Sequence, residues 1–287
     1  MTPPLKIGPL EHVPGARTLL MGILNVTPDS FSDGGRHDAP AAALDHARTL
    51  MAQGADIIDV GGESTRPGSQ RISAKEELAR ILPVLTGLRG FACAVSIDTF
   101  KPDVAAAAIR AGAHAINDIL GLQGDPDMAR VAARTGAPLI AMHNRGLDPT
   151  ADVDPARDIV ADMIAFFTRT LEIAEQAGVD RHRIILDPGI GFGKTPEQNL
   201  IALNRLGEVK ARFDLPVLVG ASRKRFIGTL TGREAADRDA GSLGAHLTAV
   251  ARGADIIRAH DVRLHADALK VADAVLQERM GFGEMEP

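Results

Sequence analysis

Short apolar runs alternate along the chain with longer segments in which apolar residues recur every three or four positions. The runs have the length and the β-branched content of buried strands, and the longer segments have the period of helices. We expect strands at residues 19–26, 56–60, 94–98, 114–118, 139–143, 183–187, 216–221 and 256–260. We expect helices at about residues 40–53, 73–87, 102–111, 125–135, 155–177, 195–212, 241–252 and 261–279. Strands that are apolar along their length and separated by helices are typical of a covered parallel sheet.

A recurring sequence pattern marks each transition from a helix to the next strand. It consists of a glycine, a short apolar run and then a polar cluster. Gly54, Gly112, Gly136 and Gly253 each stand where a helix ends, and glycine there favours the left-handed turn into the next strand. Eight strands alternating with eight helices predict an α/β fold of the closed (β/α)8 TIM barrel type. An open, doubly wound sheet remains the alternative, because alternation alone does not prove closure.

A TIM barrel of ordinary length would use nearly all of the 287 residues. The chain has no stretch that reads as a linker. We therefore expect a single domain over residues 1–287, with the barrel core at about 18–279.

Composition excludes several classes of protein. Lys and Arg number 32 against 37 Asp and Glu, and the chain has neither Trp nor Tyr, so we expect no basic or base-stacking surface for nucleic acid. The longest apolar stretches run to about six residues, whereas a membrane span needs about 18. The start of the chain lacks the apolar core of a secretory signal, and the single cysteine, Cys93, fits a reducing compartment. We expect a cytoplasmic protein without membrane contact.

Ligands of both candidate architectures bind beyond the carboxyl ends of the strands. A polar or charged residue ends or follows each predicted strand, and so many together favour a polar binding site over separate helix caps. These residues are Asn25, Glu63 with Thr65 and Arg66, Asp98, Asn117 with Asp118, His143, Asp187, Ser222 with Arg223 and Lys224, and Arg258 with His260.

Seven motifs within residues 18–265 resemble the dihydropteroate synthase family of pterin-binding enzymes, the folate-pathway targets of sulfonamides. The motifs are MGILNVTPDSFSDGG (21–35), GGESTRPG (61–68), SIDTFKPDVA (96–105), INDI (116–119), LDPGIGFGKT (186–195), GASRKRFIG (220–228) and RAHDV (258–262). The resemblance implies a transferase that joins (7,8-dihydropterin-6-yl)methyl diphosphate to 4-aminobenzoate, giving 7,8-dihydropteroate and diphosphate. It also implies a homodimer.

The resemblance assigns roles to the strand-end residues. A pterin offers an edge of N–H donors flanked by acceptors, which suits two carboxylates, an amide and one ammonium. The residues implied to bind the pterin diphosphate are Thr65, Asp98, Asn117, Met142, Asp187, Phe192, Lys224, Arg258 and His260, with Asp98, Lys224, Arg258 and His260 acting in catalysis. The residues implied to bind 4-aminobenzoate are Thr65, Arg66, Pro67 and Ser222.

Three groups are expected to handle the diphosphate. Arg258 and His260 stand two apart on one strand and so point to the same side, while Asn25 ends the strand that closure brings next to it. Mg²⁺ keeps most of its waters and takes one or two protein oxygens besides phosphate. We therefore expect Mg²⁺ as cofactor, with Asn25 as its protein ligand. Asp59 and Glu63 are interpreted as structural support.

Other interpretations stay open. Asp98, Asp118 and Asp187 could form an oxygen cage for Mg²⁺ or Ca²⁺, although Lys224 would compete with the cation. LDPGIGFGKT resembles a P-loop, but Pro188 stands where that motif needs glycine. A methyltetrahydrofolate-dependent methyltransferase domain shares the barrel but would lack the NVTPDSFSDGG and STRPG loops. A non-catalytic pterin-binding paralogue is the binding-module alternative. Two departures from the family pattern, Asn144 and Arg225, leave every implied ligand in place.

Overall fold

The computed structural model describes residues 4–27, 39–64, 69–144 and 154–279. Within them, eight parallel strands form one sheet, in the order β8-β7-β6-β5-β4-β3-β10-β9. A parallel bridge between Leu186 and Val217 joins the two outer strands and closes the barrel. The strands are β3 (Leu19–Asn25), β4 (Ile57–Gly61), β5 (Ala94–Asp98), β6 (Ala115–Asp118), β7 (Leu139–Met142), β8 (Ile184–Asp187), β9 (Leu218–Val219) and β10 (Ile256–Ala259). The predicted TIM barrel is confirmed, and the open sheet is wrong.

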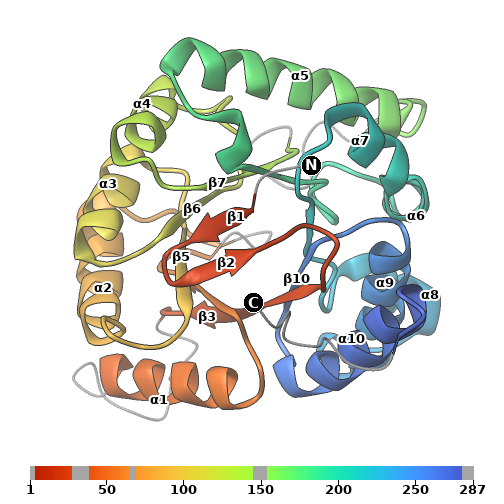
Figure 1. Cartoon of the computed structure of the whole chain (residues 1–287), viewed down its shortest axis with the longest axis horizontal. Helices are drawn as coiled ribbons and strands as arrows, with labels where there is room; N and C mark the ends of the chain where they lie inside the picture. Colours follow the sequence, from red (N-terminus) through yellow and green to blue (C-terminus); the bar gives the residue numbers. More distant parts are fainter. Residues whose placement is uncertain (1–3, 28–38, 65–68, 145–153, 280–287) are drawn as a thin grey trace.

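Helices surround the barrel (Figure 1). The predicted helix at 195–212 is two helices, because the backbone at Arg205 leaves the helical conformation. The seven-residue helix α8 was not predicted, since it is too short to show a period. The helices are α1 (Ala39–Ala52), α2 (Ala74–Gly87), α3 (Pro102–Ala111), α4 (Pro126–Thr135), α5 (Ile159–Ala177), α6 (Pro196–Asn204), α7 (Leu206–Phe213), α8 (Arg225–Thr231), α9 (Asp239–Ala251) and α10 (Val262–Leu276).

The predicted glycine turns are confirmed. Gly112 and Gly136 cap α3 and α4 in the left-handed conformation, with φ of 117° and 65°. Gly54 and Gly253 also have positive φ, at 106° and 99°. Each of these turns sends the chain from the end of a helix into the next strand at the same end of the barrel.

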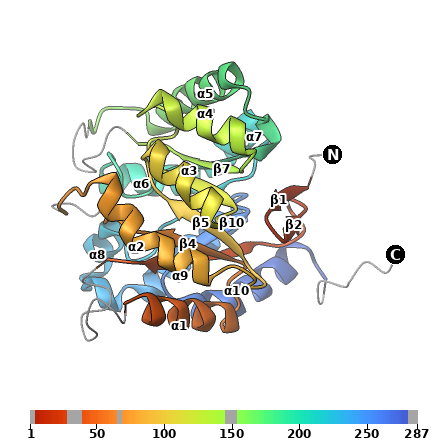
Figure 2. The same ribbon diagram turned by 90° about the vertical axis from the view of Figure 1, so that its left-hand side faces the viewer.

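A small hairpin covers the amino ends of the barrel strands (Figures 1 and 2). It pairs β1 (Leu5–Ile7) with β2 (Leu10–His12) in antiparallel register. Leu5 and Ile7 are almost wholly buried and pack against the interior side chains of the barrel. The hairpin lies outside the predicted core of residues 18–279, because three-residue strands are too short to be recognised in the sequence. It forms the base of the barrel, opposite the strand ends that carry polar residues.

The barrel interior changes from apolar to polar along five of the strands, β4, β5, β6, β8 and β10. Near the base, buried apolar residues from all eight strands, two of them from β3, pack with the hairpin, while the alternate residues pack outward against the helices. Two positions further along these five strands, polar side chains take the interior places, because successive residues of a strand point to opposite faces. The apolar interior positions are Leu19, Met21, Ile57, Ala94, Ala115, Ile140, Ile185, Leu218 and Ile256.

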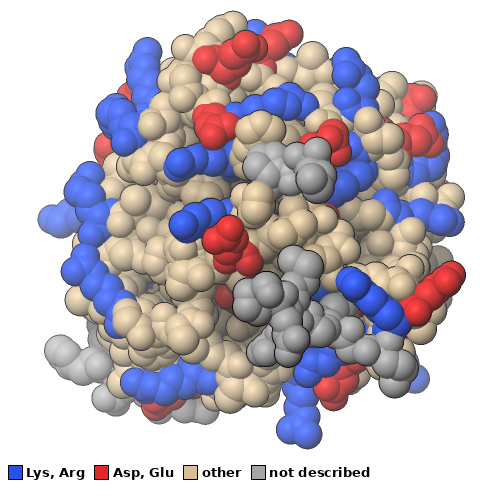
Figure 3. All heavy atoms as spheres, viewed as in Figure 1, with Lys and Arg blue, Asp and Glu red and all other residues tan. Residues whose placement is uncertain are grey.

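The base carries Lys and Arg as well as Asp and Glu, scattered around the hairpin (Figure 3). No helix in the described part of the chain is long and apolar enough to cross a membrane.

Candidate active site

A hydrogen-bonded cluster of polar side chains fills the barrel interior beyond the apolar layer. At its centre is the fully buried Asp59 on β4, whose Oδ1 accepts a hydrogen bond from Ser96 Oγ at 2.6 Å. Asp59 Oδ2 accepts from Asn117 Nδ2 at 3.1 Å and from Arg258 Nε at 2.7 Å. Arg258 Nη2 donates to Asp98 Oδ2 at 2.9 Å. We call these five residues, contributed by β4, β5, β6 and β10, the inner polar cluster.

The register of the sheet places Asn25 beside the inner polar cluster. Asn25 on β3 pairs with Gly61 on β4, and Gly61 pairs with Asp98 on β5. A β-carbon on Gly61 would lie 3.6 Å from both Asn25 Oδ1 and Asp98 Cβ. The absence of a side chain at Gly61 therefore leaves space between the amide and the carboxylate.

Asp187 and Met142 face the same interior from the opposite wall. They are register neighbours on β8 and β7, and each stands two residues beyond an apolar interior position. Asp187 Oδ1 accepts a hydrogen bond from the backbone N–H of Gly189 at 2.8 Å. This bond holds the carboxylate against the turn that follows β8.

The loop after β8 approaches Lys224 closely. The Lys224 ammonium lies 4.2 Å from the centre of the Phe192 ring, a distance at which a cation is attracted to the face of an aromatic ring. Gly191 has φ of 86° and brings backbone against the lysine, since a β-carbon there would lie 2.9 Å from Lys224 Cδ. The glycine therefore allows the close approach of Phe192 and Lys224.

Burial perturbs both carboxyl groups of the site. Burial and the charge of Asp59 raise the pKa of Asp98 to about 7. Burial likewise raises the pKa of Asp187 to about 6. The charges of Lys224 and Arg258 act in the opposite direction and lower the pKa of both carboxyls. Two carboxyls and two cations therefore share one electrostatic environment, and acids perturbed toward neutral pH are typical of functional sites.

Ser222 and His260 contact each other at the ends of neighbouring strands. Ser222 Oγ accepts a hydrogen bond from the His260 backbone N–H at 3.2 Å and lies 2.9 Å from His260 Nδ1. The next residue, Arg223, has φ of 57° and donates to both oxygens of Asp239 at 2.8 and 2.9 Å. The two neighbouring cations therefore have different partners. Arg223 pairs with Asp239 on α9, and Lys224 lies over the ring of Phe192.

The P-loop interpretation of LDPGIGFGKT is wrong. Lys194, which would bind phosphates in a P-loop, is buried and its ammonium donates to the carbonyls of Gly189 and Phe192 at 2.9 and 3.1 Å. It also lies 2.8 Å from His143 Nδ1. Lys194 therefore stabilises the loop from within. His143 Nε2 in turn lies 3.0 Å from Asp162 on α5, so this strand-end residue faces a helix.

The oxygen cage of Asp98, Asp118 and Asp187 is also wrong. Asp118 follows Asn117 on β6 and so points to the other face. Its carboxylate accepts from the backbone N–H groups of Leu120 at 2.9 Å and Leu122 at 2.8 Å. Asp118 therefore caps the turn after β6.

Within the described residues, no cluster of three or more His, Cys, Asp or Glu side chains could hold a metal. The only oxygen donor that the sequence predicted for Mg²⁺, the Asn25 amide, borders the inner polar cluster. One amide oxygen fits an ion that brings its own water and phosphate ligands.

Thr65, Arg66 and Pro67 lie outside the described residues. At the start of that segment, Glu63 pairs with Lys101 and, at 3.1 Å, with Arg71. Glu63 thus has the structural role expected for it.

Sequence reasoning missed two members of the inner polar cluster as site residues. Asp59 was interpreted only as support, and Ser96 was not considered. A usable signal was present, because each stands two residues before a site position, Gly61 or Asp98, in an otherwise apolar strand. The period of two places them on the same interior face.

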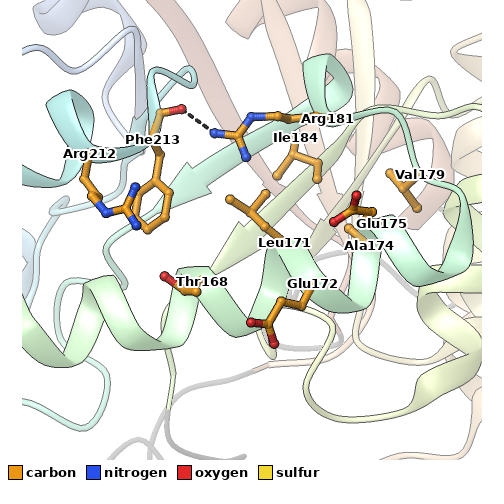
Figure 4. Close-up of a pocket in the computed structure, with 10 residues that line it drawn as sticks. All are labelled: Thr168, Leu171, Glu172, Ala174, Glu175, Val179, Arg181, Ile184, Arg212 and Phe213. Carbon is orange, nitrogen blue, oxygen red and sulfur yellow. Dashed lines mark hydrogen bonds between the residues drawn. The ribbon is translucent and has the colours of Figure 1, made fainter.

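A groove of about 540 Å³ lies on the outside of the barrel between α5 and α7 (Figure 4). Its lining includes Arg181, whose guanidinium donates to the carbonyl of Phe213 at 2.6 Å. None of the predicted site residues lines it. The groove is therefore separate from the candidate site.

Comparison with known proteins identifies the family of the chain. Residues 21–260 match the family described as pterin binding enzyme. A dihydropteroate synthase from Synechocystis sp. is 45% identical over 276 residues, which are 95% of each chain. The solved dihydropteroate synthase of Xanthomonas albilineans with 4-aminobenzoic acid has a TM-score of 0.89 and 44% identity, over 96% of this chain and 99% of that one. A structure of the enzyme from that organism in complex with 7,8-dihydropteroate has a TM-score of 0.86 and 41% identity over 96% and 99% of the two chains.

Proposed function

The chain belongs to the pterin-binding enzyme family, and we propose that it joins (7,8-dihydropterin-6-yl)methyl diphosphate to 4-aminobenzoate, as a dihydropteroate synthase does. One observation carries the proposal: Asp98, Asn117, Asp187 and Lys224 gather at one end of the barrel, where the two carboxyls share an electrostatic environment with Lys224. The relatives reported above are dihydropteroate synthases, so a methyltransferase domain is not favoured.

The pterin ring would bind between the two walls of the barrel mouth. Ionised Asp98 and Asp187 would accept hydrogen bonds from the N–H donors of the pterin, and Lys224 would donate to its acceptor edge. Asn117 has its Nδ2 engaged by Asp59, which orients the amide and leaves its oxygen as an acceptor. Met142 and Phe192 would supply apolar contact to the ring faces.

The reaction replaces one bond to the exocyclic methylene carbon by another. The bond from carbon to the diphosphate oxygen breaks with its electron pair on oxygen, the amine nitrogen of 4-aminobenzoate bonds to the carbon, and the amine loses a proton to solvent. Positive charge that develops on the pterin would be stabilised by Asp98. Because the arylamine already has a usable lone pair, the protein mainly needs to position it.

The departing diphosphate would meet Arg258, His260 and Asn25. Nε and Nη2 of Arg258 donate to carboxylates, and within the described residues nothing accepts from its Nη1, which is thus available to an anion. Asn25 would hold Mg²⁺, which when bound neutralises diphosphate charge. The Ser222 hydroxyl would donate a hydrogen bond to the carboxylate of 4-aminobenzoate, and Thr65, Arg66 and Pro67 would also contact this substrate.

The test mixes purified protein, Mg²⁺ and both substrates and measures diphosphate release with and without 4-aminobenzoate. We expect release that depends on the amine and yields dihydropteroate. Release that ignores the amine would indicate hydrolysis, and pterin binding without any release would indicate the non-catalytic paralogue. In Asp187→Ala, loss of a charge-assisted hydrogen bond should weaken pterin binding about ten- to a hundredfold, and unchanged affinity would contradict the site.

Two expectations about the cellular form belong to the proposal. A homodimer is supported by the resemblance and by exposed apolar side chains, which include Leu200 and Ile201 on α6 and Leu230 on α8. Light scattering after gel filtration tests it. A cytoplasmic location is supported by Cys93, a buried thiol whose pKa burial raises to about 11, and fractionation of cells tests it.

A further inference from the structure

Two buried histidines lie behind the site, between α9 and α10, which pack side by side (Figure 1). His246 on α9 and His265 on α10 have no exposed surface. His246 Nε2 accepts a hydrogen bond from the backbone N–H of Ala221 at 2.9 Å. His246 Nδ1 lies 2.8 Å from His265 Nε2, and His265 Nδ1 lies 2.6 Å from the carbonyl oxygen of Asp261. The two imidazoles thus connect one backbone donor to one backbone acceptor.

The two ends of this connection fix the position of every proton in it. The Ala221 N–H can only donate, so His246 Nε2 must be unprotonated and Nδ1 must carry the hydrogen. That hydrogen is donated to His265 Nε2, which leaves the proton of His265 on Nδ1. The carbonyl of Asp261 can only accept, and it receives this proton. The chain of three bonds is therefore complete only when both rings are neutral and protonated on Nδ1.

The ends of the connection adjoin two site residues. Ala221 directly precedes Ser222, and Asp261 directly follows His260. Ser222 and His260 contact each other at 2.9 Å on the side of the site. The loops after β9 and β10 are thus joined twice, once by this contact and once by the histidines behind it.

We propose that His246 and His265 are positioning residues, which hold the loops of Ser222 and His260 in their working arrangement only while both rings are neutral. This rests on the proposed function, in which Ser222 binds 4-aminobenzoate and His260 faces the diphosphate. An additional proton on His246 Nε2 would oppose the Ala221 N–H, and one on His265 Nε2 would oppose His246 Nδ1. Either proton breaks the connection.

The surroundings keep both rings neutral at neutral pH. Burial lowers the pKa of His246 well below its usual 6.5, and the charges of His265 and His260 lower it further. Burial also lowers the pKa of His265, although Asp261 and Asp239 oppose this effect. Asp239 itself is paired with Arg223. Acidification below pH 6.5 is therefore needed to protonate the pair.

The first test is independent of activity. In the ¹⁵N spectrum of the resting protein at neutral pH, both His246 and His265 should show a protonated Nδ1 and an unprotonated Nε2. Assignment comes from the loss of each signal in the His246→Gln and His265→Gln variants. An Nε2-protonated ring at either position would overturn the proposal, whether or not the protein is a dihydropteroate synthase.

The second test compares His246→Gln with His246→Leu. Glutamine has an oxygen that can accept from Ala221 and an N–H that can donate to His265, but it cannot ionise; leucine fills the space without either bond. At neutral pH we expect glutamine to keep KM for 4-aminobenzoate within about twofold. Leucine should raise this KM about tenfold, which corresponds to about 1.4 kcal/mol for an unpaired N–H, with a smaller change in kcat.

The pH profile separates positioning from a merely structural role. Below pH 6.5 the wild-type KM for 4-aminobenzoate should rise more steeply than that of the His246→Gln/His265→Gln double variant, in which neither position can ionise, since titration of every other group is common to both proteins. Parallel profiles would overturn the proposal, as would an unchanged KM in a folded His246→Leu variant. If the wild-type protein forms no dihydropteroate while the spectrum shows the expected protons, the proposed function fails and the hydrogen-bonded connection stands.

Discussion

Replacing Asp59 by asparagine would test the inner polar cluster most directly. Asparagine keeps the shape of the side chain, so its oxygen can still accept from Arg258 and Asn117, and its amide can donate to Ser96 Oγ. What it removes is the negative charge that pairs with Arg258. The change therefore isolates the electrostatic role of a residue that is completely buried.

The size of the effect follows from the contacts. A hydrogen bond to a charged group contributes about 1.5–3 kcal/mol and a neutral one about 0.5–1.5 kcal/mol, so losing the charge at the 2.7 Å bond to Arg258 should lower the free energy of unfolding by about 2 kcal/mol. Looser placement of Asn117 and Arg258 should weaken pterin binding about tenfold. The charge of Asp59 also raises the pKa of Asp98. Its removal should lower that pKa, and the acid limit of pterin binding should move to lower pH.

The assay is calorimetric titration with a pterin ligand at pH values on both sides of 7, with urea unfolding alongside. Asp118→Asn is the matched control, since Asp118 is also a buried aspartate but caps a turn on the other face of β6. We expect this control to lose stability and to keep its pterin affinity. An acid limit that stays fixed or moves upward in Asp59→Asn would refute the reasoning, as would equal loss of affinity in the two variants.

Three further predictions concern the loop, the base and the pH dependence. In Gly191→Ala, the new β-carbon would lie 2.9 Å from Lys224 Cδ, at a backbone φ of 86°. Displacement of Lys224 should raise KM for the pterin substrate, while KM for 4-aminobenzoate changes less. Steady-state kinetics measures both values, and unchanged values would show that Lys224 is not displaced. In Ile7→Ala, a buried side chain is truncated at the base, so the free energy of unfolding should fall by about 2–4 kcal/mol. Under conditions where the protein is folded, kcat should be unchanged. Urea unfolding and kinetics check this, and a loss of kcat would mean that packing at the base affects the active site. Asp187 has a pKa raised from 3.8 to about 6, so its contribution to stability is present at acid pH and is lost as pH rises through 6. The stability of Asp187→Asn relative to wild type should therefore increase as the pH rises from 3.8 to about 6. A decrease measured by urea unfolding would contradict the raised pKa.

Much of the fold could be predicted because each barrel strand is an apolar run and each helix is long enough to show its period. Three features could not. The strands of the hairpin have three residues each, too few for alternation to be recognised. Helix α8 has seven residues, barely two turns. The break at Arg205 could not be read from the sequence, because Asn204 and Arg205 are ordinary helix residues and the nearby Gly207 lies inside α7.

The site could be predicted where a polar residue ends a strand, as for Asp98 and Asn117. Site residues in the middle of a strand were harder to predict. Asp59 looks like a defect in an apolar run until the barrel places it opposite Arg258, which is 199 residues away in the chain. The side-chain direction of Asp118 likewise became clear only once the register of β6 was known. Asp59 depends on a contact with a distant segment, and Asp118 on the pairing of β6 with its neighbouring strands; the local sequence pattern shows neither.

The hairpin that forms the base lies on the same side of the molecule as both ends of the described part of the chain, residues 4–279. The described chain starts at Pro4, next to the hairpin, and Gln277, just after α10, donates to the carbonyl of Ala16 at 2.6 Å. Both ends are therefore on the side away from the polar strand ends (Figure 2). A tether to a solid support or a second enzyme that joins the protein beside the hairpin or just after α10 would attach to the closed side, leaving the open side turned toward the substrates.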